Sequence, residues 1–193
     1  MKNITKLLIA TPFLISSSVY ANQPEKNKLV AQVNLGAVYT SVNNYSGTGY
    51  KASALINLPM IISGSDFYGK LSYQTSHDEK NGSDFYFEES ELTLGIAYNI
   101  SDKQRVFLEG GDIKQSFDQN EQGVWKDYGY VIRLGTQVQK EGLNFQIALE
   151  QRDGVESDLG YNYSFAFFKN KMRISYTDVG DYQSLGLSFQ TNF

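Results

Sequence analysis

Apolar and polar residues alternate with a period of two over most of the chain beyond residue 28. In the clearest stretch, 128–138, Tyr, Ile, Leu, Thr and Val hold the even positions, and Gly, Arg and Gln hold most of the odd ones. This pattern is typical of β-strands whose two faces meet different surroundings. No stretch beyond the N-terminal residues shows the period of an amphipathic helix, so the sequence predicts an all-β fold.

Clusters of Gly, Asn, Asp and Ser divide the alternating region into ten predicted strands. These cover 29–40, 50–58, 66–76, 85–100, 105–115 and 124–139, followed by four shorter strands that begin at 143, 159, 172 and 184. Lys140-Glu141-Gly142 predicts a hairpin turn with glycine where a positive φ is needed. Alternation is weak in the fifth and ninth strands, which leaves eight strands as the alternative.

The polar face of the predicted strands consists mainly of Gly, Ser, Asn, Gln and Thr, with isolated charges of both signs. Small side chains of this kind suit the interior of a small β-barrel, where large ones do not fit. Because buried charges must be paired, the charged residues predict an internal salt-bridge network. They are Lys51, Lys70, Glu89, Glu91, Glu109, Arg133, Glu150 and Arg173. The predicted fold is therefore a single antiparallel up-and-down β-barrel with a plugged or narrow lumen.

Aromatic residues on the apolar face gather at the strand ends, with Leu, Ile, Val and Ala between them. If odd-numbered strands run outward from the periplasm, the outer rim carries Tyr39, Tyr50, Tyr73, Tyr128, Tyr130, Tyr161, Tyr176 and Tyr182. The periplasmic rim then carries Phe67, Tyr98, Phe145, Phe167, Phe189 and Phe193. Two aromatic girdles around an aliphatic band match the two interfaces of a bilayer, so the sequence predicts a transmembrane barrel. An open sheet edge in lipid would leave backbone groups unpaired, so the sheet must close.

The predicted connections differ in length between the two ends of the barrel. The long polar ones, at 41–49, 77–84 and 116–123, all lie at the outer end, and most of the others are tight. Longer outer loops and short periplasmic turns are typical of outer-membrane barrels.

The first 21 residues have the layout of a secretory signal. Lys2 and Lys6 precede an apolar stretch, and Val19-Tyr20-Ala21 offers a cleavage site. The apolar stretch is too short for a spanning helix, which needs about 20 residues. We therefore expect a cleaved signal peptide at 1–21, a short periplasmic segment at 22–28, a barrel at 29–193, and residence in the cell outer membrane.

Charge and cysteine content exclude several functions. Without Lys2 and Lys6 the chain keeps 15 basic against 21 acidic residues, a balance that argues against nucleic-acid binding. The absence of cysteine excludes disulfides, a catalytic thiol and a thiolate metal site. The predicted outer loops are acidic, but none has the spacing of a calcium loop, so no metal or cofactor is predicted.

The last ten residues, 184–193, end in an aromatic residue preceded by apolar residues at alternate positions. The positions of this predicted assembly signal are Leu185, Leu187, Phe189 and Phe193, with Thr191 as a departure. The segment resembles the terminal strand of outer-membrane proteins, which implies recognition by the barrel assembly machinery. The chain also resembles small barrels of the OmpA/OmpX-like superfamily. Its blocks 64–71 (GSDFYGKL) and 92–98 (LTLGIAY) are similar to a group of outer-membrane barrels once described as quorum-sensing factors. The resemblance carries no catalytic residues across.

Three functions are compatible with these patterns. The first is a non-enzymatic outer-membrane protein, structural or a narrow solute channel, since open aqueous channels are typical of barrels with about 16 strands. The second is a surface-interaction protein that acts through its outer loops, as an adhesin does. The third is a lipid-modifying enzyme in which His77, the only histidine, is a base toward a serine. We favour a solvated loop histidine and expect a monomer surrounded by outer-membrane lipids and lipopolysaccharide.

Overall fold

Ten β-strands make up nearly all of the chain that the computed structural model describes, namely residues 31–43, 45–58, 64–78, 85–119, 125–154 and 158–192. The strands are β1 Ala31–Val42, β2 Tyr45–Leu58, β3 Ser65–Asp78, β4 Phe85–Ser101, β5 Gln104–Gln119, β6 Trp125–Lys140, β7 Leu143–Asp153, β8 Asp158–Phe167, β9 Met172–Val179 and β10 Tyr182–Asn192. The predicted signal peptide at 1–21, the segment 22–28 and Phe193 lie outside the described residues. No helix among the described residues is long and apolar enough to cross a membrane.

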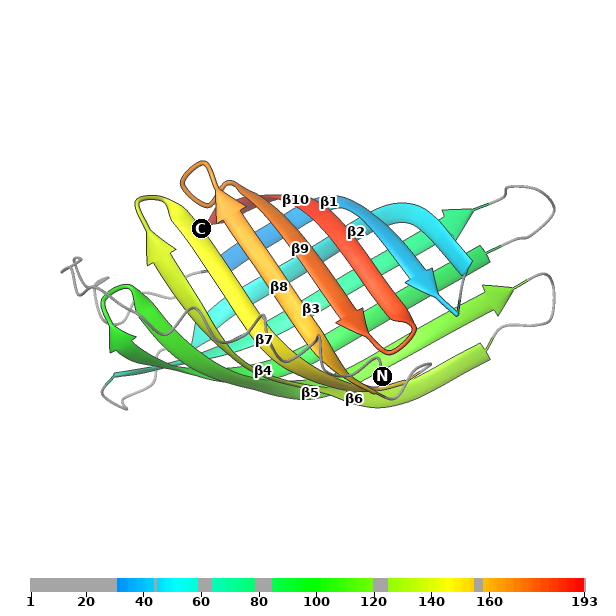
Figure 1. The fold of residues 1–193 in the computed structure, drawn as a ribbon, viewed down its shortest axis with the longest axis horizontal. Helices are drawn as coiled ribbons and strands as arrows, with labels where there is room; N and C mark the ends of the chain where they lie inside the picture. The colour runs from blue at the N-terminus through cyan, green and yellow to red at the C-terminus, as the bar shows by residue number, and fades with distance from the viewer. Residues whose placement is uncertain are drawn as a thin grey trace, which may run out of the picture.

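Each strand pairs antiparallel with its neighbours in sequence, and β1 pairs with β10 to close the sheet into a barrel (Figure 1). The closing register runs from Gln32 opposite Asn192 to Ser41 opposite Gln183. Closure gives both edge strands hydrogen-bonded partners, so the sheet has no open edge of the kind that lipid cannot tolerate. The ten-strand prediction is confirmed, and the eight-strand alternative is wrong.

The weakly alternating fifth strand is one of the longest in the barrel, at 16 residues. Its inward face carries Phe107, Ile113 and Phe117, all buried. Apolar residues therefore occur on both faces of β5, which is why its period-two signal is faint although the strand is complete.

The barrel has two ends, which differ in the chain segments that they hold. The terminal end holds the start of β1 and the end of β10, and the loop end is the opposite one. Connections at the loop end comprise residues 43–44, 79–84, 120–124, 154–157 and 180–181, and those at the terminal end comprise 59–64, 102–103, 141–142 and 168–171. Two of the predicted long outer connections remain, at 79–84 and 120–124, but the one at 41–49 is wrong, and an equally long connection at 59–64 lies at the terminal end. Predicted loops such as 41–49 are largely strand, because the backbone ladder continues where both faces of the sheet are polar.

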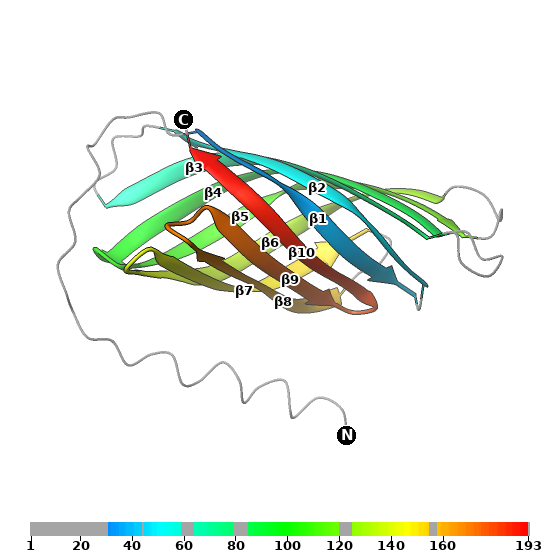
Figure 2. The same cartoon turned by 90° about the horizontal axis from the view of Figure 1, so that it is seen from above.

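Strands β3 to β6 are the four strands that reach furthest toward the loop end, so one wall of the barrel is taller than the other (Figures 1 and 2). The turn between β6 and β7 matches its prediction. Glu141 and Gly142 have φ values of 49° and 83°, the two positive values of a tight hairpin turn whose twist fits the flanking strands.

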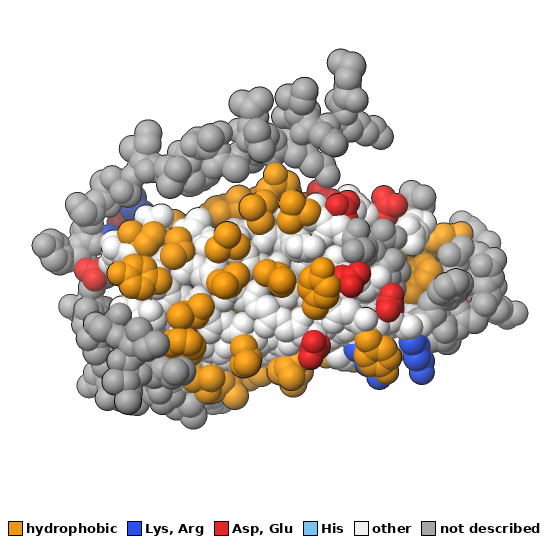
Figure 3. All heavy atoms as spheres, turned by 90° about the horizontal axis from the view of Figure 1, so that it is seen from below, with side chains coloured by type: hydrophobic (Ala, Val, Ile, Leu, Met, Phe, Trp, Pro, Cys, Tyr) orange, Lys and Arg blue, Asp and Glu red, His pale blue; other side chains and the backbone are white. Residues whose placement is uncertain are grey.

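Side chains alternate between the outer wall and the lumen along every strand. Large aliphatic side chains on the outer wall are widely exposed, such as Leu35 at 59%, Leu94 at 66% and Leu134 at 57%. Figure 3 shows hydrophobic side chains spread over one face of the barrel, while most of the charged side chains visible there lie toward the loop end. The buried residues instead line the lumen, and they include many polar and charged groups.

Candidate functional site: a charged network in the lumen

Seven charged side chains from five neighbouring strands meet inside the barrel. This lumen network consists of Lys70 from β3, Glu89 and Glu91 from β4, Glu109 from β5, Arg133 from β6, and Glu150 and Arg152 from β7. The side chain of Lys70 is 25% exposed, and the other six are between 0% and 6% exposed. Isolated charges at such burial would be strongly unfavourable, so their mutual pairing is a condition of the fold.

Arg133 is the centre of the network and contacts three carboxylates. Its Nη2 lies 2.6 Å from Glu91 Oε2, its Nη1 lies 2.5 Å from Glu109 Oε1, and its Nε lies 2.7 Å from Glu150 Oε2. A planar guanidinium presents five N–H donors on three nitrogens in a rigid fork, so each nitrogen of Arg133 can bond a different acid. Arg133 therefore holds β4, β5 and β7 in a fixed relation to β6.

Arg152 extends the network toward the loop end. Its guanidinium pairs with Glu89 and, through Nη2 at 2.8 Å, with Glu150 Oε1. The guanidinium carbon also lies 4.4 Å from the centroid of the Tyr182 ring, a cation–π contact. The hydroxyl of Tyr182 in turn accepts a hydrogen bond of 2.7 Å from Gln74 Nε2.

Two of these residues correct the sequence analysis. Tyr182 is not in the outer aromatic girdle, because its side chain points into the lumen and is only 2% exposed. Arg152 is missing from the predicted network, yet it belongs to β7 and is 2% exposed. The alternation along each strand could have placed both residues in the lumen. Residue 182 is two positions from the lumen-facing Ser184, and residue 152 is two positions from Glu150.

Lys70 closes the network on the terminal side. Its Nζ lies 3.0 Å from Glu91 Oε1 and 3.3 Å from Glu109 Oε1. Glu109 also accepts a 3.1 Å hydrogen bond from the hydroxyl of Tyr68. Lys51 lies opposite the buried Gln74 in the β2–β3 register and so faces the lumen, although it forms no ion pair within 4.0 Å with any described residue. With Lys51 included, four basic groups balance four acidic ones.

Two apolar clusters bracket the lumen network. The cluster toward the loop end contains Val42, Phe85, Phe87, Phe117 and Tyr182. The cluster toward the terminal end contains Tyr68, Ala97, Phe107 and Ala148. The order along β4 shows the layers directly, because Phe87 is followed by Glu89 and Glu91 and then by Ala97. The charged layer thus lies between two apolar layers, and these low-polarity surroundings strengthen each ion pair.

Contacts between strands that are not neighbours show that side chains cross the lumen. Gln74 on β3 contacts Tyr182 on β10, Tyr182 contacts Arg152 on β7, and Arg152 contacts Glu89 on β4. Because β4 is paired with β3, these contacts complete a circuit inside the barrel. A circuit of buried side chains at one level leaves little cross-section for a solute.

Arg173 is the predicted network residue that the structure places apart. It lies on β9 near the terminal end, where Nη1 is 3.4 Å from Ser164 Oγ and Nη2 is 3.3 Å from Gln190 Oε1. No carboxylate lies within 4.0 Å of Arg173 among the described residues. The alternation of the sequence correctly placed Arg173 on the lumen face. Which charged residues contact each other also depends on how far along the barrel axis each residue lies.

Aromatic side chains on the outer wall lie toward both ends of the aliphatic surface. Tyr50 and Tyr128 are 59% and 71% exposed, and the rings of Tyr50 and Tyr73 are 6.2 Å apart. Outward-facing aromatic residues toward the loop end include Tyr39, Tyr50, Tyr73, Tyr128, Tyr130, Tyr161 and Tyr176, together with Tyr86 and Tyr163, which the sequence analysis omitted. Those toward the terminal end include Phe67, Tyr98, Phe145, Phe165, Phe167 and Phe189.

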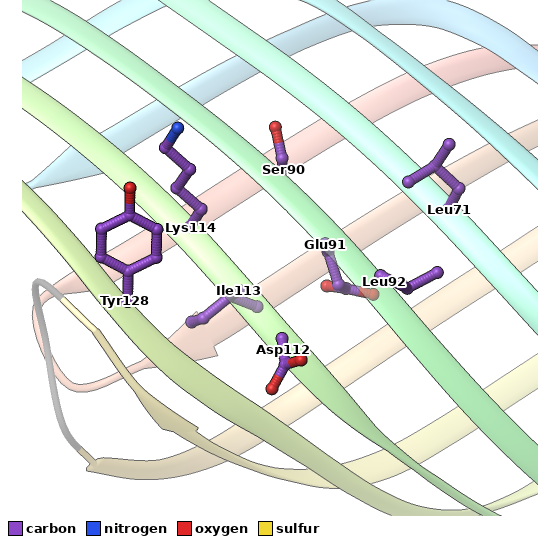
Figure 4. A pocket seen from close by; sticks show the side chains of 8 residues that line it. All are labelled: Leu71, Ser90, Glu91, Leu92, Asp112, Ile113, Lys114 and Tyr128. Carbon is purple, nitrogen blue, oxygen red and sulfur yellow. The ribbon is translucent and has the colours of Figure 1, made fainter.

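On β4 to β6, the outer wall carries polar and charged side chains on the loop-end side of the aliphatic residues. A shallow groove there has Leu71 and Leu92 on one side and Ser90, Asp112 and Lys114 on the other (Figure 4). Lys114 Nζ lies 5.5 Å from the centroid of the Tyr128 ring on the next strand. This is where the aliphatic surface gives way to charged residues.

His77 lies in β3 rather than in a loop. Its side chain faces outward, and Nδ1 lies 3.1 Å from the carbonyl oxygen of Phe85. Ser76 faces the opposite way, into the barrel, where its hydroxyl hydrogen-bonds Thr40 at 2.9 Å. Because the two side chains lie on opposite faces of β3, His77 cannot act as a base toward Ser76 in this arrangement. In the part of the chain that the structure describes, no group of three or more His, Cys, Asp or Glu is placed to hold a metal ion.

Solved structures provide the comparisons with known proteins. No protein-family model and no curated protein matches the chain. The translocator domain of the autotransporter NalP from Neisseria meningitidis superposes with a TM-score of 0.50 at 11% identity, covering 86% of this chain and 88% of that one. Ail, the attachment invasion locus protein of Yersinia pestis, gives 0.43 at 13% identity over 86% and 100% of the two chains. The KdgM porin gives 0.43 at 12% identity over 83% and 99%. The chain thus shares the closed barrel fold of the NalP translocator domain.

Proposed function

We propose that this chain is an integral outer-membrane β-barrel without enzymatic activity whose lumen is closed by its own side chains. The observation that carries the proposal is the sequence of layers inside the barrel. An ion approaching from the loop end meets Phe85 and Phe87, then the buried pairs of the lumen network, then Tyr68 and Phe107. The role is therefore structural in this state, rather than that of an open channel.

The outer wall supports placement in a membrane. Exposed Leu, Ile and Val side chains occur around the barrel on β1 to β10, at positions where a soluble barrel would present polar groups. In lipid, such a surface is stable, and the closed sheet meets the requirement that every backbone group be paired. We assign the loop end to the cell exterior and the terminal end to the periplasm.

Conductance in planar bilayers tests the closed lumen. We expect the refolded wild-type barrel to insert without discrete current steps. The double variant E89A/R152A removes one acid and one base from the network, so it keeps the net charge while removing two side chains that cross the lumen. We expect this variant to conduct.

A matched double variant controls for the loss of two charges. D112A/K114A also removes one acid and one base, but both lie on the outer wall and outside the lumen. It should remain as silent as the wild type. Discrete steps from the wild-type protein would contradict the closed lumen and favour a narrow solute channel instead.

The export and assembly signals belong to the same proposal. Cleavage after Ala21 is checked by N-terminal sequencing of the protein recovered from outer membranes. Recognition of the C-terminal residues by the assembly machinery is checked by deleting Phe193, which should lower the amount of folded, heat-modifiable barrel. A full amount of folded barrel would contradict that recognition.

A further inference from the structure

Arg173 and Arg105 differ from the other arginines of the lumen in their partners. Arg133 and Arg152 each contact at least two carboxylates. Arg173 contacts only the hydroxyl of Ser164 and the amide oxygen of Gln190 among the described residues, and its Nε is buried without a hydrogen-bond partner. A guanidinium in such a place is costly unless an anion neutralises it.

Arg105 brings a second positive charge to the same end of the lumen. It lies near the start of β5, on the same inward face as Phe107, and Arg173 lies near the start of β9, so both residues are at the terminal end of the barrel. Its Nε donates a 2.5 Å hydrogen bond to Gln137 Oε1, and its Nη1 is 4.0 Å from Asp66, a carboxylate that is 49% exposed. One distant and solvated acid does not compensate two arginines.

We propose that Arg173 and Arg105 form a binding site for a small oxyanion of the phosphate or sulfate class at the terminal end of the lumen. The two guanidiniums supply charge and directed N–H donors, which suit tetrahedral oxyanions. The amide groups of Gln137 and Gln190 supply further polar contacts at the rim of the site. The partial exposure of Arg105, at 33%, gives the anion access from solvent. The apolar cluster of Tyr68, Ala97, Phe107 and Ala148 separates this site from the lumen network.

Phosphate-dependent stability of the refolded, full barrel tests the site. Anything that binds the folded state alone raises its stability as its concentration rises. Inorganic phosphate, with ionic strength held constant by sodium chloride, should raise the urea midpoint of the wild type. The variant R173Q keeps a polar side chain but not the charge, and it should lose the phosphate response. R105Q should weaken the response at least tenfold in apparent Kd.

The control is K114Q, which removes one positive charge from the outer wall and should keep the full phosphate response. Without phosphate, R173Q should be at least as stable as the wild type, because it removes a charge with no counterion. An equal phosphate response in R173Q and the wild type would overturn the site, since it would be a general salt effect. No response in the wild type would overturn it as well. If R173Q does not refold, R105Q and broadening of the phosphate ³¹P signal by wild-type barrel decide the question.

Discussion

The guanidinium of Arg152 stacks on the ring of Tyr182 inside the barrel, with 4.4 Å between the guanidinium carbon and the ring centroid. Tyr182 belongs at once to the apolar cluster at the loop end and to the circuit of polar contacts that crosses the lumen. This one ring therefore joins the charged layer to the apolar layer above it, and several consequences can be measured.

Replacing Tyr182 separates its two contributions. In Y182F the ring stays but Gln74 loses its hydrogen bond, and because Gln74 Oε1 already has no partner, we expect a loss of about 1–3 kcal/mol. Y182L also removes the cation–π contact, worth about 2 kcal/mol when desolvated, so its loss should be larger. Urea unfolding in lipid vesicles measures both. Equal midpoints for Y182F and the wild type would show that the Gln74 contact contributes nothing.

Arg133 should be the most sensitive position of the lumen network. R133M leaves Glu91, Glu109 and Glu150 without their shared partner, and breaking a buried ion pair from one side costs about 3–5 kcal/mol. K70M should cost less, because Lys70 is partly exposed and its two acids keep Arg133. Urea midpoints of the two variants measure the order. A K70M variant less stable than R133M would show that Arg133 is not the centre of the network.

Much of this arrangement follows from the sequence, because lipid and lumen impose opposite demands on alternate residues. Parity placed Glu91, Glu109 and Arg133 inside the barrel. It did not reveal which of them touch, since that depends on the register between strands. The prediction failed at the strand ends, where lipid no longer requires apolar residues on the outer face. Beyond the aliphatic surface both faces of a strand accept polar residues, so the ends of β1 and β7 resembled loops and Arg152 was missed. Tyr182 was misplaced because a tyrosine at a strand end suits a membrane interface as well as a lumen.

Gly95 should resist even the smallest side chain. A Cβ at this position would run into the ring of Tyr68, which lies over the glycine on the lumen side. G95A should therefore displace Tyr68, weaken its hydrogen bond to Glu109 and cost about 1–3 kcal/mol through overpacking. In a Y68A background the same substitution should cost close to nothing. A double-mutant cycle of unfolding midpoints checks this coupling, and additive effects would show that the ring does not fill the space above Gly95.

A charge on the outer wall tests whether that wall faces lipid. Leu94 is 66% exposed and lies between Leu92 and Ile96 in the middle of the aliphatic surface. In phospholipid vesicles, L94R should cost about 2–4 kcal/mol, the penalty for arginine near the bilayer centre of a membrane barrel. Gln151 provides the matched control, since it is exposed on β7 next to the hydroxyl of Tyr130, 3.3 Å away at the edge of that surface.

Q151R should cost no more than about 1 kcal/mol, because arginine near the interface reaches water. The difference between the two variants, measured by urea unfolding in the same vesicles, cancels the intrinsic effect of adding an arginine to a strand. If Leu94 faced water, replacing it with arginine would leave the stability unchanged or raise it. Equal stabilities of L94R and Q151R would therefore contradict a membrane-spanning barrel, whereas a gap of two or more kcal/mol places Leu94 in the hydrocarbon layer.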